Sequence, residues 1–362
     1  MPDFARTLRL AVLALSLAGC AAPAPVVVEP ERPEVDYWPS LDRADVHRGV
    51  TPETGVVGHL QKVVASEEDT FPDIARRFNV GYAELVAANP GVDPWLPGEG
   101  TEILLPTAHV IPDAPRRGIV INLPSMRLWW FGEPDDEGAQ TVVTHPIGIG
   151  RVGWATPLGE TRVVSKAADP AWYPPASIRK EHAAAGDPLP AVVPPGPDNP
   201  LGSHAIRLAL PGYLIHGTNK PWGVGMRVSH GCIRLYPEDV AVLFEEIRPG
   251  MPVTLLDQPW LVAEQEGELV LEVHPVLRDS RADWSDGLRR IYGAAGDRDV
   301  SWHRVGYAVT TARGVPVPIG AGTDDEEWFR RAPVVPNEAR GNYADAAESD
   351  GAAPASAPGA AP

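Results

Sequence analysis

Cysteine is nearly absent from this sequence, which has only Cys20 and Cys232 among 362 residues and can therefore form at most one disulfide. Basic residues are also few: the sequence has 31 Lys and Arg against 48 Asp and Glu, and its formal net charge is −17. A nucleic-acid-binding protein needs a basic patch before anything else, so this charge balance argues against a nucleic-acid partner. An acidic surface mainly favours solubility.

Long apolar runs are missing from the N-terminal region as well. The apolar run at residues 10–17 is too short to cross a bilayer core of about 30 Å as a permanent helix. It follows Arg6 and Arg9 and ends in the sequence LAGC at Cys20, which predicts a signal peptide over residues 1–20. LAGC resembles the bacterial lipobox, in which the cysteine is acylated and becomes the mature N-terminus. The alternative is an ordinary signal peptide with an incidental cysteine.

The second cysteine is the candidate for chemistry. If the first is lipidated, Cys232 has no disulfide partner in an oxidising compartment, and a lone thiol there is more often reactive than structural. Ser229, Gly231 and Arg234 surround it with small or polar groups, which fit poorly with a buried structural cysteine. His216 lies sixteen positions earlier, and a histidine brought beside a thiol by a folded-back loop can raise its thiolate fraction.

The chain contains 41 prolines and 35 glycines. Together with its length, this composition predicts two or three compact domains joined by extended segments. Residues 21–57 are rich in proline and charge, which predicts a linker that holds the following domains off the membrane. Residues 321–362 turn acidic and then Ala-Pro-rich, and such a composition predicts a disordered tail.

Residues 58–107 have the size of one very small domain. We predict a strand at 59–65, helices at 71–78 and 82–89, and a strand at 98–106. The order of these elements and the spacing of their residues resemble a LysM module. The matching residues are Glu68-Asp69-Thr70, Ile74-Ala75, Phe78, Val80, Leu85, Asn89, Pro97-Gly98 and Ile103 to Pro106. The resemblance implies a βααβ fold that binds the N-acetylglucosamine-containing glycan of peptidoglycan or chitin; the alternative is a purely structural βααβ unit.

The rest of the chain predicts a mainly β fold with few helices. β-Branched and aromatic residues predict strands at 118–123, 127–131, 141–147 and 160–165. The best candidate helix is 237–247, where Val240, Leu243 and Ile247 have helical spacing. Residues 258–320 are predicted to form a C-terminal β extension, with a strand at 269–273 and a hairpin at 305–319.

The motifs within residues 116–257 are Pro146 to Gly150, Thr156 to Gly159, Trp172 to Pro175, Gly196 to Gly202, His216-Gly217-Thr218 and Ser229 to Leu235. With these motifs, residues 116–257 resemble an L,D-transpeptidase catalytic domain of the YkuD (ErfK/YbiS-like) family. The resemblance implies a β-sandwich-like catalytic domain, often preceded by a LysM module. It also implies a peptidoglycan cross-linking enzyme that uses a cysteine and requires no cofactor or metal.

The implied chemistry assigns roles to individual residues. The thiolate of Cys232 attacks the bond between diaminopimelate and the terminal D-alanine of a stem tetrapeptide, and a thioester forms. His216 is the acid and base, oriented by the carbonyl of Gly217. Backbone N–H groups around Gly231 and Cys232 are the candidate oxyanion hole.

Arg234 is the candidate partner of a substrate carboxylate. The alternative is a purely structural role, in which Arg234 stabilises the turn. Ser229, Tyr213 and Asn219 complete the candidate substrate-binding set, together with Gly231. His230 is expected to face away from the thiol. A zinc site of His216, His230 and Cys232 is an alternative on ligand type alone, without any CxxC or HxxxH spacing to support it.

Two functions of different class remain open. The first is a lipid-anchored periplasmic L,D-transpeptidase, at the outer membrane and bound to the cell wall. Its acceptor is then diaminopimelate of another stem or a lysine of an envelope protein, such as a lipoprotein or an outer-membrane protein. The second is a catalytically silent lipoprotein that tethers the membrane to peptidoglycan.

Overall fold

The computed structural model describes residues 45–320 and 325–338. The predicted signal peptide, its lipidation site Cys20 and residues 339–362 of the predicted tail lie outside the described residues. Within the described ranges, no helix combines the length and the apolar character needed to cross a membrane.

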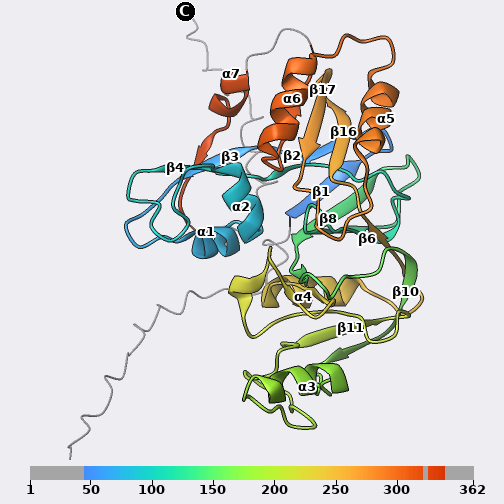
Figure 1. Cartoon of the computed structure of the whole chain (residues 1–362). Helices are drawn as coiled ribbons and strands as arrows, with labels where there is room; N and C mark the ends of the chain where they lie inside the picture. Colours follow the sequence, from blue (N-terminus) through green and yellow to red (C-terminus); the bar gives the residue numbers. More distant parts are fainter. Residues whose placement is uncertain (1–44, 321–324, 339–362) are drawn as a thin grey trace, which may run out of the picture. The chain divides into compact units, whose positions relative to one another are not determined.

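A mixed sheet of nine strands forms the centre of the structure, which confirms the mainly β fold class (Figure 1). In sheet order the strands are β1 (Asp45–Val50), β8 (Gln140–Pro146), β7 (Arg127–Phe131), β6 (Gly118–Asn122), β15 (Pro252–Leu256), β10 (Gly159–Ala168), β11 (His204–Leu208), β12 (Leu214–His216) and β14 (Ile233–Arg234). Most neighbours are antiparallel, but β6 pairs with β15 and β12 pairs with β14 in parallel. The parallel β12–β14 pair matters most for the site.

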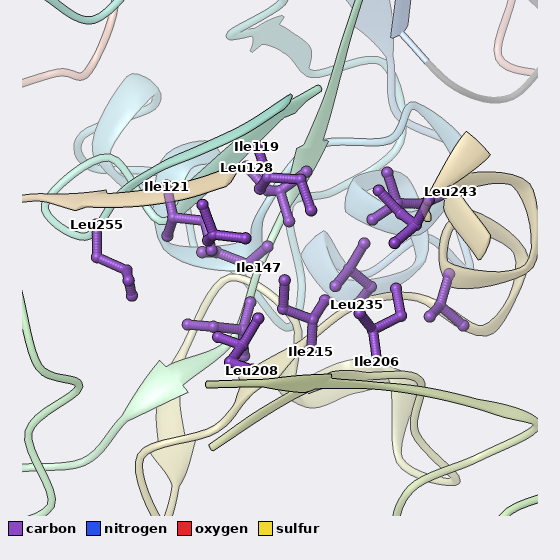
Figure 2. Packing of buried hydrophobic residues seen from close by; sticks show 14 of the residues in the cluster. Ile119, Ile121, Leu128, Ile147, Ile206, Leu208, Ile215, Leu235, Leu243 and Leu255 are labelled. Atoms are coloured by element: carbon purple, nitrogen blue, oxygen red, sulfur yellow. The ribbon is translucent and has the colours of Figure 1, made fainter. Parts of the chain in front are cut away.

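The main core lies on one face of this sheet and is covered by helix α4 (Pro237–Glu246). Alternate residues of a strand share one face, and accordingly Ile119 and Ile121 of β6 are both fully buried in this core. Figure 2 shows their side chains together with those of Ile206 and Ile215 from β11 and β12, and Leu243 from α4. Helical spacing brings Val240 of α4 into the same core. The predicted helix at 237–247 is thus found.

Residues 58–107, called the small segment below, contain β3 (Gln61–Val64), α1 (Phe71–Arg77), α2 (Tyr82–Ala88) and β4 (Glu102–Leu105). This is the predicted order of strand, helix, helix and strand. Phe71, Ile74 and Phe78 share one helix face and are at most 2% exposed in a core of the segment's own. The carboxylate of Asp73 accepts a hydrogen bond from the N–H of Thr70 and helps to begin α1.

Buried ion pairs join the small segment to the nine-stranded sheet and α4. Arg127 of β7 donates to both carboxylate oxygens of Glu84 in α2, at 3.0 and 2.8 Å, and the two side chains are 1% and 6% exposed. Arg76 of α1 donates to both carboxylate oxygens of Glu238 in α4, at 2.9 and 3.0 Å. Charges taken out of water are tolerated only when they are paired, so these contacts fix one region against the other.

The C-terminal part differs from the prediction. Strands β16 (Trp260–Gln265), β17 (Glu268–Val273) and β18 (Pro316–Pro318) form a sheet that packs against α5 (Trp284–Ala295) and α6 (Trp302–Thr311) (Figure 1). The strand predicted at 269–273 is present, but the hairpin predicted at 305–319 is wrong. Val305 and Ala308 face the core at helical spacing, so α6 forms instead.

Two segments that the composition assigned to a linker and a tail contain regular structure. In the predicted linker, β1 pairs with β8 of the central sheet, and β2 (Val56–Gly58) pairs with β5 (Ala108–Val110). In the predicted tail, residues 325–330 form α7 (Asp325–Arg330), and β19 (Val334–Val335) pairs with β3. Each strand is stabilised by pairing with a distant partner, and local composition carries no sign of such a partner.

We predict that Glu84→Gln destabilises the protein by about 3–5 kcal/mol, because the mutation leaves Arg127 charged and buried without a countercharge. Glu102→Gln is the matched control, since Glu102 is 55% exposed in its pair with Lys62 and should change stability by only about 0.5 kcal/mol. Urea unfolding followed by circular dichroism measures both variants. Equal stabilities for the two would show that the buried pair is not required.

Candidate active site

Two short parallel strands bring the candidate residues together. β12 ends at His216 and β14 begins directly after Cys232, and their register places His216 opposite Arg234 and Ile215 opposite Ile233. The chain therefore leaves His216, runs through a loop, and returns with Cys232 beside the same strand. This is the folded-back loop that the sequence predicts.

His216 is held as a neutral imidazole. Its side chain is buried, and Nδ1 lies 2.6 Å from the carbonyl oxygen of Gly217. A carbonyl oxygen only accepts, so Nδ1 carries the proton and Nε2 has a free lone pair. Burial, and secondarily the positive charge of Arg234, lowers the pKa of His216 to about 3, against the opposing effect of the Gly217 hydrogen bond. Gly217 thus lies where its predicted orienting role requires.

Cys232 is held as a neutral thiol. Burial raises the pKa of Cys232, while the backbone near Leu214 and the charge of Arg234 partly oppose this shift. Its Sγ donates a weak hydrogen bond to the carbonyl oxygen of Gly212 at 3.6 Å. The resting site therefore contains a thiol and an imidazole rather than a preformed thiolate and imidazolium.

Ser229 and Gly231 shape the turn before the cysteine. Ser229 is buried, and its Oγ donates to the carbonyl oxygen of Cys232 at 2.6 Å and accepts from the N–H of Gly231 at 3.1 Å. These contacts favour a role of Ser229 in holding the turn over direct contact with substrate. They also occupy the N–H of Gly231, which leaves that of Cys232 as the candidate oxyanion donor of the two.

Glycine is required at 231 for conformation and for space. Its φ of +104° lies in the region that side chains rarely adopt, and a Cβ there would approach Cε1 of Tyr213 to 2.9 Å. The carbonyl oxygen of Gly231 accepts from the hydroxyl of Thr156 at 2.9 Å. Tyr213, from the candidate substrate-binding set, thus packs on the turn, and its hydroxyl donates to Ala155 at 3.4 Å. Asn219 is half-buried, three residues after His216.

The Pro146 to Gly150 motif forms the support of this turn. Gly148 exchanges two backbone hydrogen bonds with Arg234, at 2.7 and 2.9 Å, and β9 (Ile149–Gly150) pairs in parallel with β13 (Arg227–Ser229). A Cβ at Gly150 would collide with the carbonyl oxygen of Trp154 and lie 3.1 Å from Cα of Gly231. The motif is therefore glycine-rich because two backbones meet there.

Arg234 presents an unmatched positive charge at the site. Among the described residues no carboxylate pairs with it, and its Nε is buried without a hydrogen-bond partner. Burial lowers the pKa of Arg234, and Cys232 acts in the opposite direction. A buried guanidinium in this state favours an anionic ligand, and a carboxylate matches its planar donors.

His230, which directly follows β13, contacts α3 and the stretch that follows β9. Its Nε2 lies 3.4 Å from Glu181 of α3 (Ala176–Ala184) and 3.1 Å from Arg151, and its ring meets Trp154 edge-on at 4.8 Å. Glu181, Arg151 and Trp154 were not identified from the sequence. All three are distant from His230 along the chain, and only the fold brings them to it. In the described part of the chain, no group of three His, Cys, Asp or Glu side chains is placed to hold a metal ion.

Known proteins are similar in sequence to this chain. The family model of the YkuD L,D-transpeptidase catalytic domain matches residues 116–255. "Probable L,D-transpeptidase YbiS" of Escherichia coli (strain K12) is 38% identical over 273 residues, which cover 72% of this chain and 88% of that protein. The chain belongs to the L,D-transpeptidase family.

Two further L,D-transpeptidases are similar to shorter parts of this chain. "Probable L,D-transpeptidase YcfS" of Escherichia coli (strain K12) is 46% identical over 226 residues, or 61% of this chain and 69% of that protein. Among solved structures, the catalytic domain from the Enterococcus faecium L,D-transpeptidase is 20% identical and covers 40% of this chain and 100% of that chain, with a TM-score of 0.29. The family assignment therefore rests on the similarity in sequence and not on this structure.

We predict that alkylation of Cys232 by iodoacetamide has a pH midpoint above the usual thiol pKa of about 8.5, because burial disfavours the thiolate. The rate should show no step near pH 6.5, since the pKa of His216 lies near 3 and the imidazole stays neutral through that range. Arg234→Gln should raise the midpoint further, because it removes the positive charge that favours the thiolate.

This measurement uses a Cys20→Ser background, in which Cys232 is the sole thiol of the sequence. Intact-protein mass followed against time at each pH gives the rate constants. A plateau already reached below pH 7 would mean that a thiolate and imidazolium pair exists at rest.

Proposed function

We propose that this protein is a cysteine L,D-transpeptidase in which Cys232 is the nucleophile and His216 the acid and base. Family membership supports peptidoglycan cross-linking in general. The observation that carries the residue assignment is the Gly217 carbonyl 2.6 Å from Nδ1 of His216, because it leaves Nε2 as a proton acceptor on the strand beside Cys232. No cofactor is needed for this chemistry.

The first half-reaction is acyl transfer to sulfur. The Sγ proton of Cys232 moves to Nε2 of His216 as Sγ attacks the carbonyl carbon between the L centre of diaminopimelate and the terminal D-alanine of a stem tetrapeptide. The oxyanion that forms accepts a hydrogen bond from the N–H of Cys232. When the carbon–nitrogen bond breaks, His216 returns the proton to the leaving amine. D-Alanine departs and a thioester remains.

The second half-reaction transfers the acyl group to an amine. His216 takes a proton from the incoming nitrogen as this attacks the thioester carbonyl, and the carbon–sulfur bond breaks. The proton passes to Sγ, which restores the neutral thiol and imidazole. The acceptor is the diaminopimelate amine of another stem or the lysine amine of an envelope protein.

Arg234 has two functions in this scheme. Its positive charge, which lowers the pKa of Cys232, stabilises the negative charge that develops on sulfur during attack. Its guanidinium also binds a carboxylate of the stem peptide, because the described residues supply no countercharge for it. The small segment, as its resemblance to LysM implies, binds peptidoglycan glycan.

A silent tether is the second candidate function, and the resting protonation states do not favour it. A purely binding domain has no need of a buried imidazole with an oriented free lone pair beside a thiol. The two candidates differ in whether a covalent adduct forms on Cys232.

We predict one covalent adduct when the protein is treated with a carbapenem, which mimics the acyl donor. Cys232→Ser should abolish the adduct, because an alcohol with only a histidine behind it cannot supply an anion comparable to the thiolate. His216→Ala should slow acylation by about a hundred-fold or more, the usual contribution of a positioned acid–base group, and high pH should partly restore the rate. His230→Ala should have a much smaller effect, since its contacts are to Glu181, Arg151 and Trp154.

Intact-protein mass against time and pH measures all three variants. If His230→Ala proves slower than His216→Ala, the base has been assigned to the wrong histidine. An adduct that persists on Cys232→Ser would remove the thiol from the mechanism.

Localisation is proposed from the leader sequence, which lies outside the described residues. Export and acylation of Cys20 would anchor the protein in a membrane, proposed to be the outer membrane, with the catalytic domain in the periplasm at the cell wall. We predict that Cys20→Ser releases the protein from the membrane fraction. Fractionation at high salt, which removes proteins held by charge alone, checks this, and a variant that still pellets would contradict the lipid anchor.

A further inference from the structure

The loop that connects His216 with Cys232 makes backbone contacts with the small segment. The N–H of Tyr82 donates to the carbonyl oxygen of Val224 at 3.4 Å, and that of Ala83 donates to the carbonyl oxygen of Gly225 at 3.1 Å. Both donors belong to the first turn of α2, whose N–H groups have no partner within the helix. Val224 and Gly225 are both buried, so this contact excludes water.

Close approach of two glycines makes these hydrogen bonds feasible. A Cβ on Gly225 would collide with the backbone of Gly81 and Tyr82, and a Cβ on Gly81 would lie 3.0 Å from Cα of Gly225. Any side chain at 225 would therefore separate the loop from α2. The contact depends on backbone shape and is sensitive to a single methyl group.

The chain just after Cys232 is fixed to the same region. The hydroxyl of Tyr236 donates to the carbonyl oxygen of Val80 at 3.2 Å. Two residues later, Glu238 has a side chain that is 1% exposed and accepts both hydrogen bonds of Arg76. The small segment therefore binds the chain both before and after the candidate nucleophile.

Glu84 links these contacts to the central sheet. Its Oε2 accepts from the N–H of Gly81 at 2.6 Å and from Nη2 of Arg127 at 2.8 Å. The turn that meets Gly225 is thus tied to β7 by a buried charge pair. In turn, Arg127 donates to the hydroxyl of Thr144 in β8 at 3.3 Å.

We propose that residues 76–84 of the small segment form a positioning element for the transfer site, holding the Val224–Gly225 loop and the Tyr236–Glu238 stretch so that Cys232 stays in register with His216. This inference rests on the proposed function of Cys232 and His216. It assigns the small segment a role in the reaction that is separate from any binding of glycan.

The strands at the site are too short to fix this register alone. β12 has three residues and β14 has two, so few ladder hydrogen bonds hold them together. A displacement of about 1 Å in reacting groups can cost roughly a hundred-fold in rate, so external support of the loop has catalytic consequences. Val224 and Tyr236 are the points where that support is applied.

The first test compares Gly225→Ala with Gly250→Ala. Both glycines have positive φ, +76° and +93°, so both mutations strain the backbone, but a Cβ at 250 meets nothing within 4 Å. We expect Gly225→Ala to slow carbapenem acylation of Cys232 by about ten- to a hundred-fold relative to Gly250→Ala, measured well below both melting temperatures. Rates that agree within about twofold would overturn the proposal, because backbone strain would then explain the whole effect.

The second test uses a contact that tolerates milder changes. Arg76→Gln, Glu238→Gln and the double variant form a cycle, with Arg76→Lys as the conservative rescue. We expect each single variant to lower the acylation rate, Arg76→Lys to restore part of it, and the double variant to lose less than the two single losses combined. A fall in melting temperature with an unchanged acylation rate of the folded protein would indicate a merely structural contact.

The pH midpoint of Cys232 alkylation reports on the surroundings of the thiol. A loss of stability alone does not change this midpoint. If the loop shifts, the distance from Cys232 to Arg234 changes and the midpoint changes with it; an unchanged midpoint in Gly225→Ala would count against the proposal. Failure of the proposed function has a different signature. In that case the unmutated protein forms no carbapenem adduct, or Cys232→Ser still forms one.

Discussion

The buried ion pair between Arg127 and Glu84 is the constraint on which the rest of the structure depends. Both side chains are almost fully buried, and a buried charge without its partner is far more costly than the pair itself is stabilising. The fold is therefore restricted to arrangements in which α2 lies against β7. Because Glu84 also accepts from Gly81, the same pair fixes the turn that contacts Gly225.

Burial sets the protonation states of the two candidate catalytic residues. Burial lowers the pKa of His216 and raises that of Cys232, so both groups are neutral at rest. A neutral thiol is protected from adventitious oxidation, which acts on the thiolate. In the proposed mechanism, the nearby charge of Arg234 then stabilises negative charge on sulfur only as it develops, which is where stabilisation accelerates a reaction.

Besides the Pro146 to Gly150 motif, three further regions outside the parallel strand pair support the turn that carries Cys232. The small segment contacts Val224, α3 reaches His230 through Glu181, and Asp279 after β17 accepts two hydrogen bonds from Arg227 of β13. Each support comes from a region far from Cys232 in sequence.

Local sequence patterns determined the elements and the candidate chemistry. Hydrophobic periodicity located α1, α2 and α4, and the combination of a lone cysteine with a histidine sixteen positions earlier singled out Cys232 and His216. These signals are local because a helix face or a reactive turn is encoded within a few residues. Strands that depend on a distant partner, such as β1 and β19, carry no such code, and their segments were predicted to be a linker and a tail.

Only the tertiary structure decided how the site is held and charged. The pKa of His216 depends on burial by residues from several strands. Whether a carboxylate of the described residues lies close enough to pair with Arg234 depends on how the fold places those carboxylates, and none does. The docking of α2 on Gly225 needs two glycines more than a hundred residues apart to meet. The sequence determines that a cysteine and a histidine are available, and long-range packing determines their protonation and register, because both quantities depend on atoms that are distant along the chain.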